Sequence, residues 1–255
     1  MHKPVFNGIG VALVTLFDEH LALDASQTAD LAVKLVAAGV TGVVVAGTTG
    51  EAAALDSPER AALVSALKAT LPPNVPVVCG IGAPSTYQAL GHLDHAIGAG
   101  ADALLALSLP GDADQVAYYE TLCTRAGSTP LLAYHYPGAS APGIPIGVLA
   151  TLPVRGVKDS SGDAERLLET KATFDEPIYT GSPALLSLAG ATGCAGAILA
   201  VANWLPETSV AAFDGDAKAQ SSLSEAIRRS KTPFPAAVKG LTAERFNTPT
   251  YRRMG

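Results

Sequence analysis

Short apolar runs alternate with longer segments of helical periodicity along the whole chain, and no low-complexity stretch interrupts them. Continuous apolar runs are typical of strands that are buried on both faces of a parallel sheet. Eight such runs predict strands at residues 11–16, 42–46, 75–80, 103–107, 130–134, 156–158, 177–180 and 196–200.

Helices are predicted between these strands, and their ends carry the expected signals. Pro58 falls in the first turn of one segment, and Gly39 follows the end of another. The predicted helices cover residues 26–38, 57–69, 85–97, 114–126, 146–151, 163–174, 183–191 and 206–213.

A strand followed by a helix, repeated eight times, indicates an α/β protein with a (β/α)8 TIM barrel. An open, doubly wound sheet is the alternative, but the glycine-rich dinucleotide turn is missing after the first strand. We therefore expect a barrel domain at residues 1–213. A shortened C-terminal helical segment at residues 214–255 is expected to pack on it.

Composition and charge narrow the class of function. The formal net charge is -6 and no run of Lys or Arg occurs, which argues against binding to a nucleic-acid backbone. The apolar stretch at residues 5–17 is short, contains glycines and continues into Asp18 and Glu19, so we interpret it as a strand, neither a signal peptide nor a membrane span.

The cysteines and histidines suggest no disulfide framework and no metal site. Cys79, Cys123 and Cys194 are odd in number and lack CxxC spacing, so a reducing cytoplasm is the expected location. His92 and His95 are three residues apart but have no further ligands nearby, which favours a solvated helix face. We expect an enzyme that needs neither metal nor other cofactor.

In a TIM barrel the catalytic groups gather at the carboxyl ends of the strands. Lys158 ends the sixth predicted strand, where a partly desolvated site favours a neutral amine that can attack a ketone. Tyr134 ends the fifth strand and offers a phenol for proton transfer. Taken alone, such a lysine more often extends into water, and such a tyrosine is more often a rim residue. The convergence of both on one end of the barrel favours catalysis.

The turn after the second strand offers a cradle for a carboxylate. Gly47, Thr48 and Thr49 supply hydroxyls and closely spaced N–H groups on a backbone that glycine makes permissive. An ordinary turn with capping threonines is the simpler interpretation of this segment alone. Gly181 and Ser182, after the seventh strand, are expected to add a polar contact.

Five segments together resemble the dihydrodipicolinate synthase and N-acetylneuraminate lyase family of class I aldolases. They keep the family's order and are residues 8–17, 42–51, 134–137 (Tyr-His-Tyr-Pro), 156–163 (Gly-Val-Lys-Asp-Ser-Ser-Gly-Asp) and 193–203. Each motif is weak by itself, whereas the threonine turn, Tyr-x-x-Pro and Gly-x-Lys-Asp together are specific.

The resemblance implies a role for each matching residue. Lys158 matches the lysine that forms a Schiff base with a pyruvate-like 2-oxo acid, and Tyr134 matches the proton-relaying phenol. Thr48 matches a relay hydroxyl, and Thr49 matches a carboxylate binder. Ile198 matches a strand-eight residue that lines the pyruvate pocket.

Two departures from the family bear on substrate and assembly. Ala139 stands where the synthases carry an arginine that binds the second substrate, and residues 109–112 lack the tyrosine that they place after the fourth strand. In the family a helical tail follows a segment resembling residues 236–253, whereas this sequence stops almost at once after it. A homo-oligomer, dimer or tetramer, is therefore expected without a defined geometry.

We expect a lyase that cleaves or condenses an aldol, acting on pyruvate and an aldehyde or on a 2-oxo-3-deoxy acid. The alternatives are a 4-hydroxy-tetrahydrodipicolinate synthase that condenses pyruvate with aspartate semialdehyde, a 2-oxo-3-deoxy sugar acid dehydratase, and a catalytically silent 2-oxo acid-binding homologue. Intact Lys158, Tyr134 and Thr48 weigh against the silent homologue.

Overall fold

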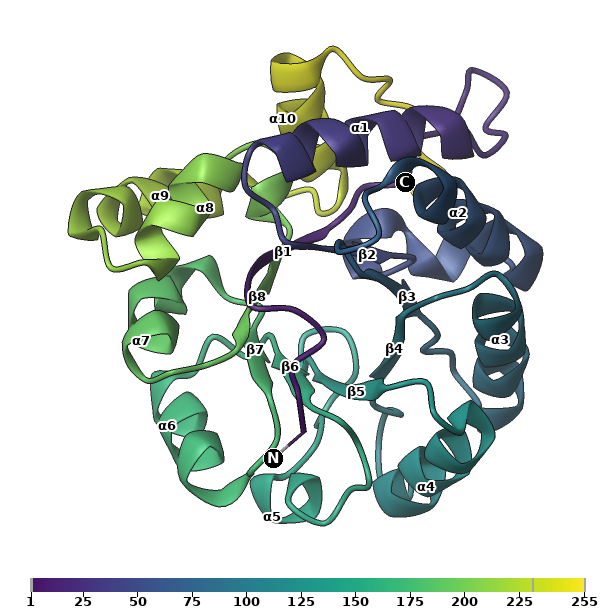
Figure 1. The fold of residues 1–255 in the computed structure, drawn as a ribbon, viewed down its shortest axis with the longest axis vertical. Helices are drawn as coiled ribbons and strands as arrows, with labels where there is room; N and C mark the ends of the chain where they lie inside the picture. Colours follow the sequence, from purple (N-terminus) through teal and green to yellow (C-terminus); the bar gives the residue numbers. More distant parts are fainter. Residues whose placement is uncertain (1, 231, 255) are drawn as a thin grey trace.

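Eight parallel strands close into a barrel and helices surround it (Figure 1), which confirms the predicted (β/α)8 fold. The computed structural model describes residues 2–230 and 232–254. Each strand pairs with the next along the chain, and β8 pairs with β1. The strands are β1 (Gly8–Ala12), β2 (Gly42–Val45), β3 (Val77–Gly80), β4 (Ala103–Leu107), β5 (Leu131–His135), β6 (Val157–Asp159), β7 (Ile178–Thr180) and β8 (Gly196–Leu199).

Helices follow the strands close to where the sequence predicts them. Several begin at an aspartate whose side chain accepts a backbone N–H of the first turn, as Asp56 does from Glu59. The helices are α1 (Ala25–Ala37), α2 (Ser57–Thr70), α3 (Thr86–Gly98), α4 (Gln115–Ala126), α5 (Ile146–Leu149), α6 (Ala164–Thr173), α7 (Leu186–Ala191), α8 (Pro206–Phe213), α9 (Ala217–Ser230) and α10 (Ala236–Phe246), with short 3₁₀ helices η1 (Thr48–Gly50), η2 (Ala52–Ala54), η3 (Pro183–Leu185) and η4 (Val201–Asn203).

The first strand lies earlier in the chain than predicted. Residues 11–16 are expected to form it, whereas β1 spans Gly8–Ala12. Its glycines let other groups approach closely: a Cβ on Gly10 would lie 2.5 Å from the ring of Phe6, which fills the barrel interior at this level. Glycine has low β propensity, so hydropathy alone misses a strand whose glycines are needed for close packing.

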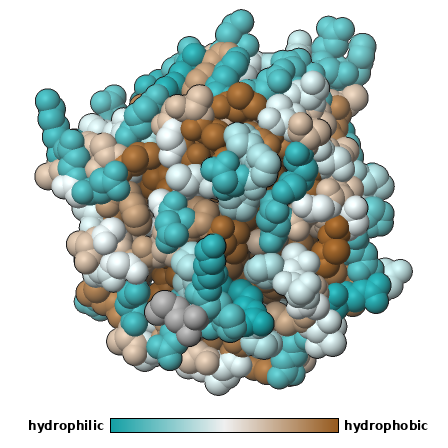
Figure 2. Space-filling view, in the orientation of Figure 1, coloured by the Kyte–Doolittle hydropathy of each residue, from teal (hydrophilic) through white to brown (hydrophobic). Residues whose placement is uncertain are grey.

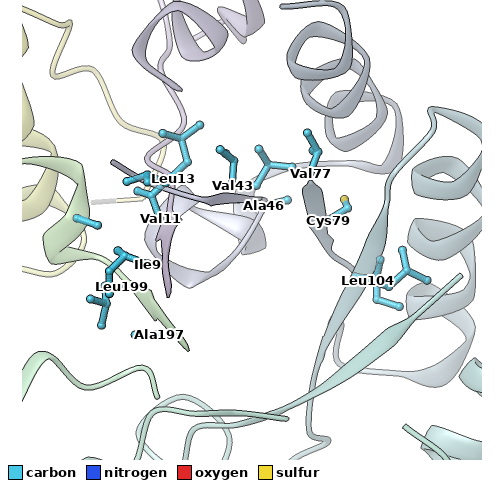
Figure 3. Close-up of a cluster of buried hydrophobic side chains, with 14 of the residues drawn as sticks. Ile9, Val11, Leu13, Val43, Ala46, Val77, Cys79, Leu104, Ala197 and Leu199 are labelled. Carbon is cyan, nitrogen blue, oxygen red and sulfur yellow. The ribbon is translucent and has the colours of Figure 1, made fainter. Parts of the chain in front are cut away.

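The strands alternate between two apolar layers. One side of each strand packs against the surrounding helices, and Figure 3 shows Val43 on β2, Val77 on β3 and Leu13, just after β1, pointing outward. The other side fills the barrel with a smaller cluster that contains Tyr134 and Ile198. Because successive side chains alternate along a strand, each side chain at a strand end faces either the barrel interior or the helices, and its neighbour faces the other way.

The C-terminal helices α9 and α10 pack beside the barrel, and the chain ends near α2 and β2 (Figure 1). The division into a barrel domain that ends at residue 213 and a separate C-terminal segment stays a prediction. Within the part of the chain that the structure describes, no helix is long and apolar enough to cross a bilayer. Polar residues cover much of the face in Figure 2, with smaller apolar patches between them.

Candidate functional site

Lys158 and Tyr134 meet inside the barrel. They are cross-strand partners on β6 and β5, and both side chains are 5% exposed. The Lys158 Nζ lies 4.1 Å from the centroid of the Tyr134 ring. Among the described residues no hydrogen bond or ion pair to this Nζ is found. The amine is thus enclosed by aromatic and apolar surface and is left available for a ligand.

The neighbouring carboxylate faces away from the amine. Asp159 is the next residue on β6, so its side chain points toward the helices, where Arg166 Nε donates to it at 2.7 Å. Ser161 also donates to Asp159, through its N–H and its hydroxyl. The prediction that Lys158 ends the sixth strand, at residues 156–158, is wrong in detail, because β6 begins at Val157 and continues to Asp159.

A second tyrosine extends the aromatic wall beyond Tyr134. The ring of Tyr136 stacks on that of Tyr134, with centroids 5.9 Å apart and planes inclined by 15°. Tyr136 is half-buried, and this burial raises the pKa of its phenol. It is not among the predicted site residues, although its position two residues after Tyr134 is a signal that both side chains share one face.

The turn after β2 presents N–H groups that the protein itself does not use. Gly47, Thr48 and Thr49 donate no backbone hydrogen bond to any described residue, whereas the next three residues do. Thr48 is half-buried and Thr49 is 5% exposed. Three consecutive N–H groups without a protein acceptor, beside two hydroxyls, are donors of the kind that can bind a carboxylate.

Two buried side chains hold the carbonyl groups of this turn. Thr15 donates its hydroxyl to the Gly50 carbonyl at 2.7 Å. Arg60 lies beneath the turn and donates to the carbonyls of Ala46, Ala52 and Gly80, as well as to that of Leu55. Burial lowers the pKa of Arg60. Sequence reasoning missed Arg60, which looks like an ordinary polar position on an amphipathic helix.

The remaining predicted site residues lie on β7 and β8. Ile198 is 1% exposed and belongs to the interior cluster that also contains Tyr134. Gly181 donates its N–H to the Asp159 carbonyl at the end of β6 and is packed so closely that a Cβ would lie 1.8 Å from the Ser160 Oγ. Ser182 is half-buried and donates its N–H to the Thr180 hydroxyl. The predicted residues thus lie at or near the carboxyl ends of five strands, β2, β5, β6, β7 and β8, and Lys158 is in direct contact with Tyr134.

The histidine pair on α3 is not the simple solvated face that we expect from the sequence. His92 is half-buried, and its Nδ1 lies 2.7 Å from the Ser57 Oγ. Burial lowers the pKa of His92 to about 4. A surface cleft of about 580 Å³ lies beside it, remote from Lys158. The described residues contain no group of three His, Cys, Asp or Glu side chains placed to hold a metal ion.

A closed barrel with an enclosed lysine amine at the carboxyl ends of its strands is typical of Schiff-base-forming lyases of the class I aldolase type. The chain belongs to the dihydrodipicolinate synthetase family, which it matches over residues 5–244.

Relatives and solved structures agree with this assignment. An uncharacterised DapA-like lyase of Halobacterium salinarum is 35% identical over 91% of this chain and 82% of its own length. A 4-hydroxy-tetrahydrodipicolinate synthase of Natronomonas pharaonis is 33% identical over 85% of this chain and 78% of its own. The KD(P)GA structure from T. tenax aligns with a TM-score of 0.86 at 25% identity, covering 95% of this chain and 89% of that one.

The structure of YagE, a family protein from Escherichia coli K12 in complex with pyruvate, aligns with a TM-score of 0.90 at 24% identity. It covers 98% of this chain and 92% of that one, and it supports the fold.

Proposed function

We propose that Lys158 forms a Schiff base with pyruvate or a related 2-oxo acid and so makes or breaks a carbon–carbon bond beside the former carbonyl. The observation that carries this proposal is the enclosed Lys158 Nζ, which lies over the Tyr134 ring and has no carboxylate partner among the described residues. A structural lysine at this depth would be expected to have an anionic partner, as Lys239 has in Glu51.

The reaction follows from the chemistry of the amine. The neutral Nζ adds to C2 of the 2-oxo acid, and the C2 oxygen leaves as water to give an iminium. Loss of a proton from C3 then gives an enamine, whose C3 attacks the carbonyl carbon of an aldehyde as the aldehyde oxygen takes up a proton. Water adds to the iminium and releases Lys158 with the product. Cleavage is the same sequence in reverse.

Each of the other predicted residues has a place in this scheme. Tyr134 carries protons to and from the oxygen at C2, and Thr48 relays them. The N–H groups at Gly47 and Thr49 hold the carboxylate of the 2-oxo acid. Ile198 lines the apolar side of the pocket. Gly181 and Ser182, at the end of β7, contact the distal part of the substrate.

The second substrate is an aldehyde without a carboxylate. Ala139 is exposed and has no charged group to offer. Arg155 does not replace the missing arginine, because it precedes β6 at the amino end of the strand and its N–H bonds to the Leu131 carbonyl at the start of β5. Arg166 lies nearer the site, but its guanidinium is bound to Asp159 and to the Ile144 carbonyl.

The Schiff base is tested by incubating the protein with pyruvate and borohydride and measuring the intact mass. We expect an increase that corresponds to one reduced pyruvate adduct, mapped to Lys158 and absent from Lys158→Ala. EDTA is expected to leave the trapping unchanged. Good pyruvate binding by an enzyme whose Lys158 stays unlabelled would refute the mechanism.

Substrate choice is tested by kcat/KM with pyruvate and a panel of aldehydes. Glyceraldehyde and other hydroxylated or neutral aldehydes are expected to exceed aspartate semialdehyde by about a thousandfold, because a desolvated carboxylate without a cation costs several kcal/mol. If aspartate semialdehyde is the best substrate, the protein is a 4-hydroxy-tetrahydrodipicolinate synthase and the argument from Ala139 is wrong.

Assembly and location stay predictions of the sequence. We propose a homo-oligomer, dimer or tetramer, in the cytoplasm. Sedimentation velocity of the purified protein distinguishes these assemblies from a monomer.

A further inference from the structure

Glu51 is a fully buried acid next to the carboxylate-binding turn. It follows Gly50 directly, is 0% exposed, and adopts a left-handed backbone conformation with φ of 59°. A non-glycine residue adopts this conformation only when its surroundings hold it there. The scheme above gives Glu51 no chemical role, so its burial needs another explanation.

The hydrogen-bond partners of the Glu51 carboxylate come from the C-terminal part of the chain. Lys239, on α10 and 2% exposed, donates to Glu51 Oε1 at 2.6 Å. The backbone N–H groups of Arg253 and Met254 each donate to Glu51 Oε2 at 2.8 Å. Lys239 also donates to the Tyr251 carbonyl, which joins the helix to the segment that follows it. Both oxygens of the carboxylate are thereby bound.

The side chain of Arg253 anchors the same segment to the barrel. Its guanidinium makes two hydrogen bonds to the Glu59 carboxylate on α2, at 2.7 and 2.8 Å. It also donates to the carbonyl of Ala54, three residues after Glu51, and to that of Leu21. Figure 1 shows the described part of this last segment running from α10 toward α2 and β2.

We propose that residues 247–254, together with Lys239, are a positioning element of the active site, which holds the 47–49 turn in the geometry that binds the substrate carboxylate. The inference rests on the function proposed above. Glu51 is two residues after Thr49, so a change in its backbone conformation redirects the N–H groups that precede it. Thr15, which follows β1, and Arg60, on α2, bind carbonyl groups on either side of the turn, and the C-terminal segment adds a third attachment through Glu51.

The proposal predicts a specific kinetic change when the contact to Glu51 is lost. Lys239→Met leaves the Glu51 carboxylate buried without its cation, so the turn is expected to rearrange. Misplacement of binding groups by about 1 Å can cost up to a hundredfold, and we expect the KM for pyruvate to rise by about 10- to 100-fold. The kcat at saturating pyruvate is expected to fall by a smaller factor than the KM rises, because Lys158 and Tyr134 do not contact this region and only the Thr48 relay lies in the turn.

Arg245→Met is the matched control on the same helix. It removes the hydrogen bonds from Arg245 to the Trp204 carbonyl and to Glu207, and so loosens α10 without touching Glu51. Its KM for pyruvate is expected to stay near that of the wild type, even where its melting temperature falls. A rise in the KM of Lys239→Met that Arg245→Met does not show, at similar melting temperatures, distinguishes a positioning role from general destabilisation.

Glu59→Gln keeps the inference testable if Lys239→Met does not fold. It leaves Glu51 and Lys239 intact, keeps a side-chain oxygen that can accept the Asp56 N–H at the start of α2, and weakens the attachment of Arg253, so a smaller rise in KM is expected. Wild-type trapping by borohydride is measured first: its failure refutes the proposed function. Normal trapping in the wild type, with an unchanged KM in the folded variants or an equal rise in Arg245→Met, overturns the positioning role alone.

Discussion

Replacing Tyr134 by phenylalanine isolates the phenol oxygen from everything else that this side chain does. The ring fills the barrel interior, stacks on Tyr136 and lies under the Lys158 Nζ at 4.1 Å. Phenylalanine keeps the ring and its attraction for a cation. What it loses is the hydroxyl, and with it the route for protons to and from the substrate oxygen.

The expected loss follows from the general contribution of a positioned acid or base. Such a group accelerates a step by about 10²- to 10⁴-fold, which corresponds to about 2.7 to 5.5 kcal/mol of activation free energy. We expect kcat to fall by this factor in Tyr134→Phe. Imine formation still proceeds without the phenol, because water can supply the proton that the departing C2 oxygen needs, so borohydride should still trap pyruvate on Lys158, only more slowly.

Tyr179→Phe is the matched control. Tyr179 is the partner of Lys158 on β7 and also faces the barrel interior, but its hydroxyl is bound to the backbone of Phe6. Its loss is expected to lower stability without removing a proton relay. Steady-state kcat and the rate of trapping are measured for both variants. A Tyr134→Phe enzyme with wild-type kcat, or one slowed no more than Tyr179→Phe, would remove the phenol from the mechanism.

Two further predictions concern stability. Gly181→Ala places a Cβ 1.8 Å from the Ser160 Oγ, so we expect the free energy of unfolding, measured in urea, to fall by about 1 to 3 kcal/mol. Adding Ser160→Gly to this variant should restore part of the lost stability. An unchanged urea midpoint in Gly181→Ala would contradict the packing argument. His92 has its pKa lowered from 6.5 to about 4 by burial, so the folded state is favoured above pH 6.5 and loses that advantage as the pH falls toward 4. His92 is half exposed, so we expect the free energy of unfolding to fall by only about 1 kcal/mol across this range. Urea unfolding at several pH values measures this fall, which is expected to be absent in His92→Gln. The same dependence of stability on pH in both proteins would contradict the prediction.

The order of strands and helices could be predicted because it depends on local patterns. Apolar runs and capping residues lie within a few positions of one another, and β4 and α8 are found with the predicted bounds. The exception is β1, whose glycines are poor strand formers. They are placed there because Phe6 and the backbone of β8 approach too closely for a side chain, and such approaches depend on residues far away in the chain.

The sequence alone determined the fold class and the identity of the candidate amine and phenol, since the motifs around Lys158 and Tyr134 are contiguous. Their contact, by contrast, depends on the register between β5 and β6. Glu51 and Lys239 each look anomalous as charged residues in apolar surroundings, but no local pattern joins two positions 188 residues apart. Only closure of the barrel and the return of the chain end to β2 bring them together, because burial of a charge is stable only where the tertiary fold supplies its partner.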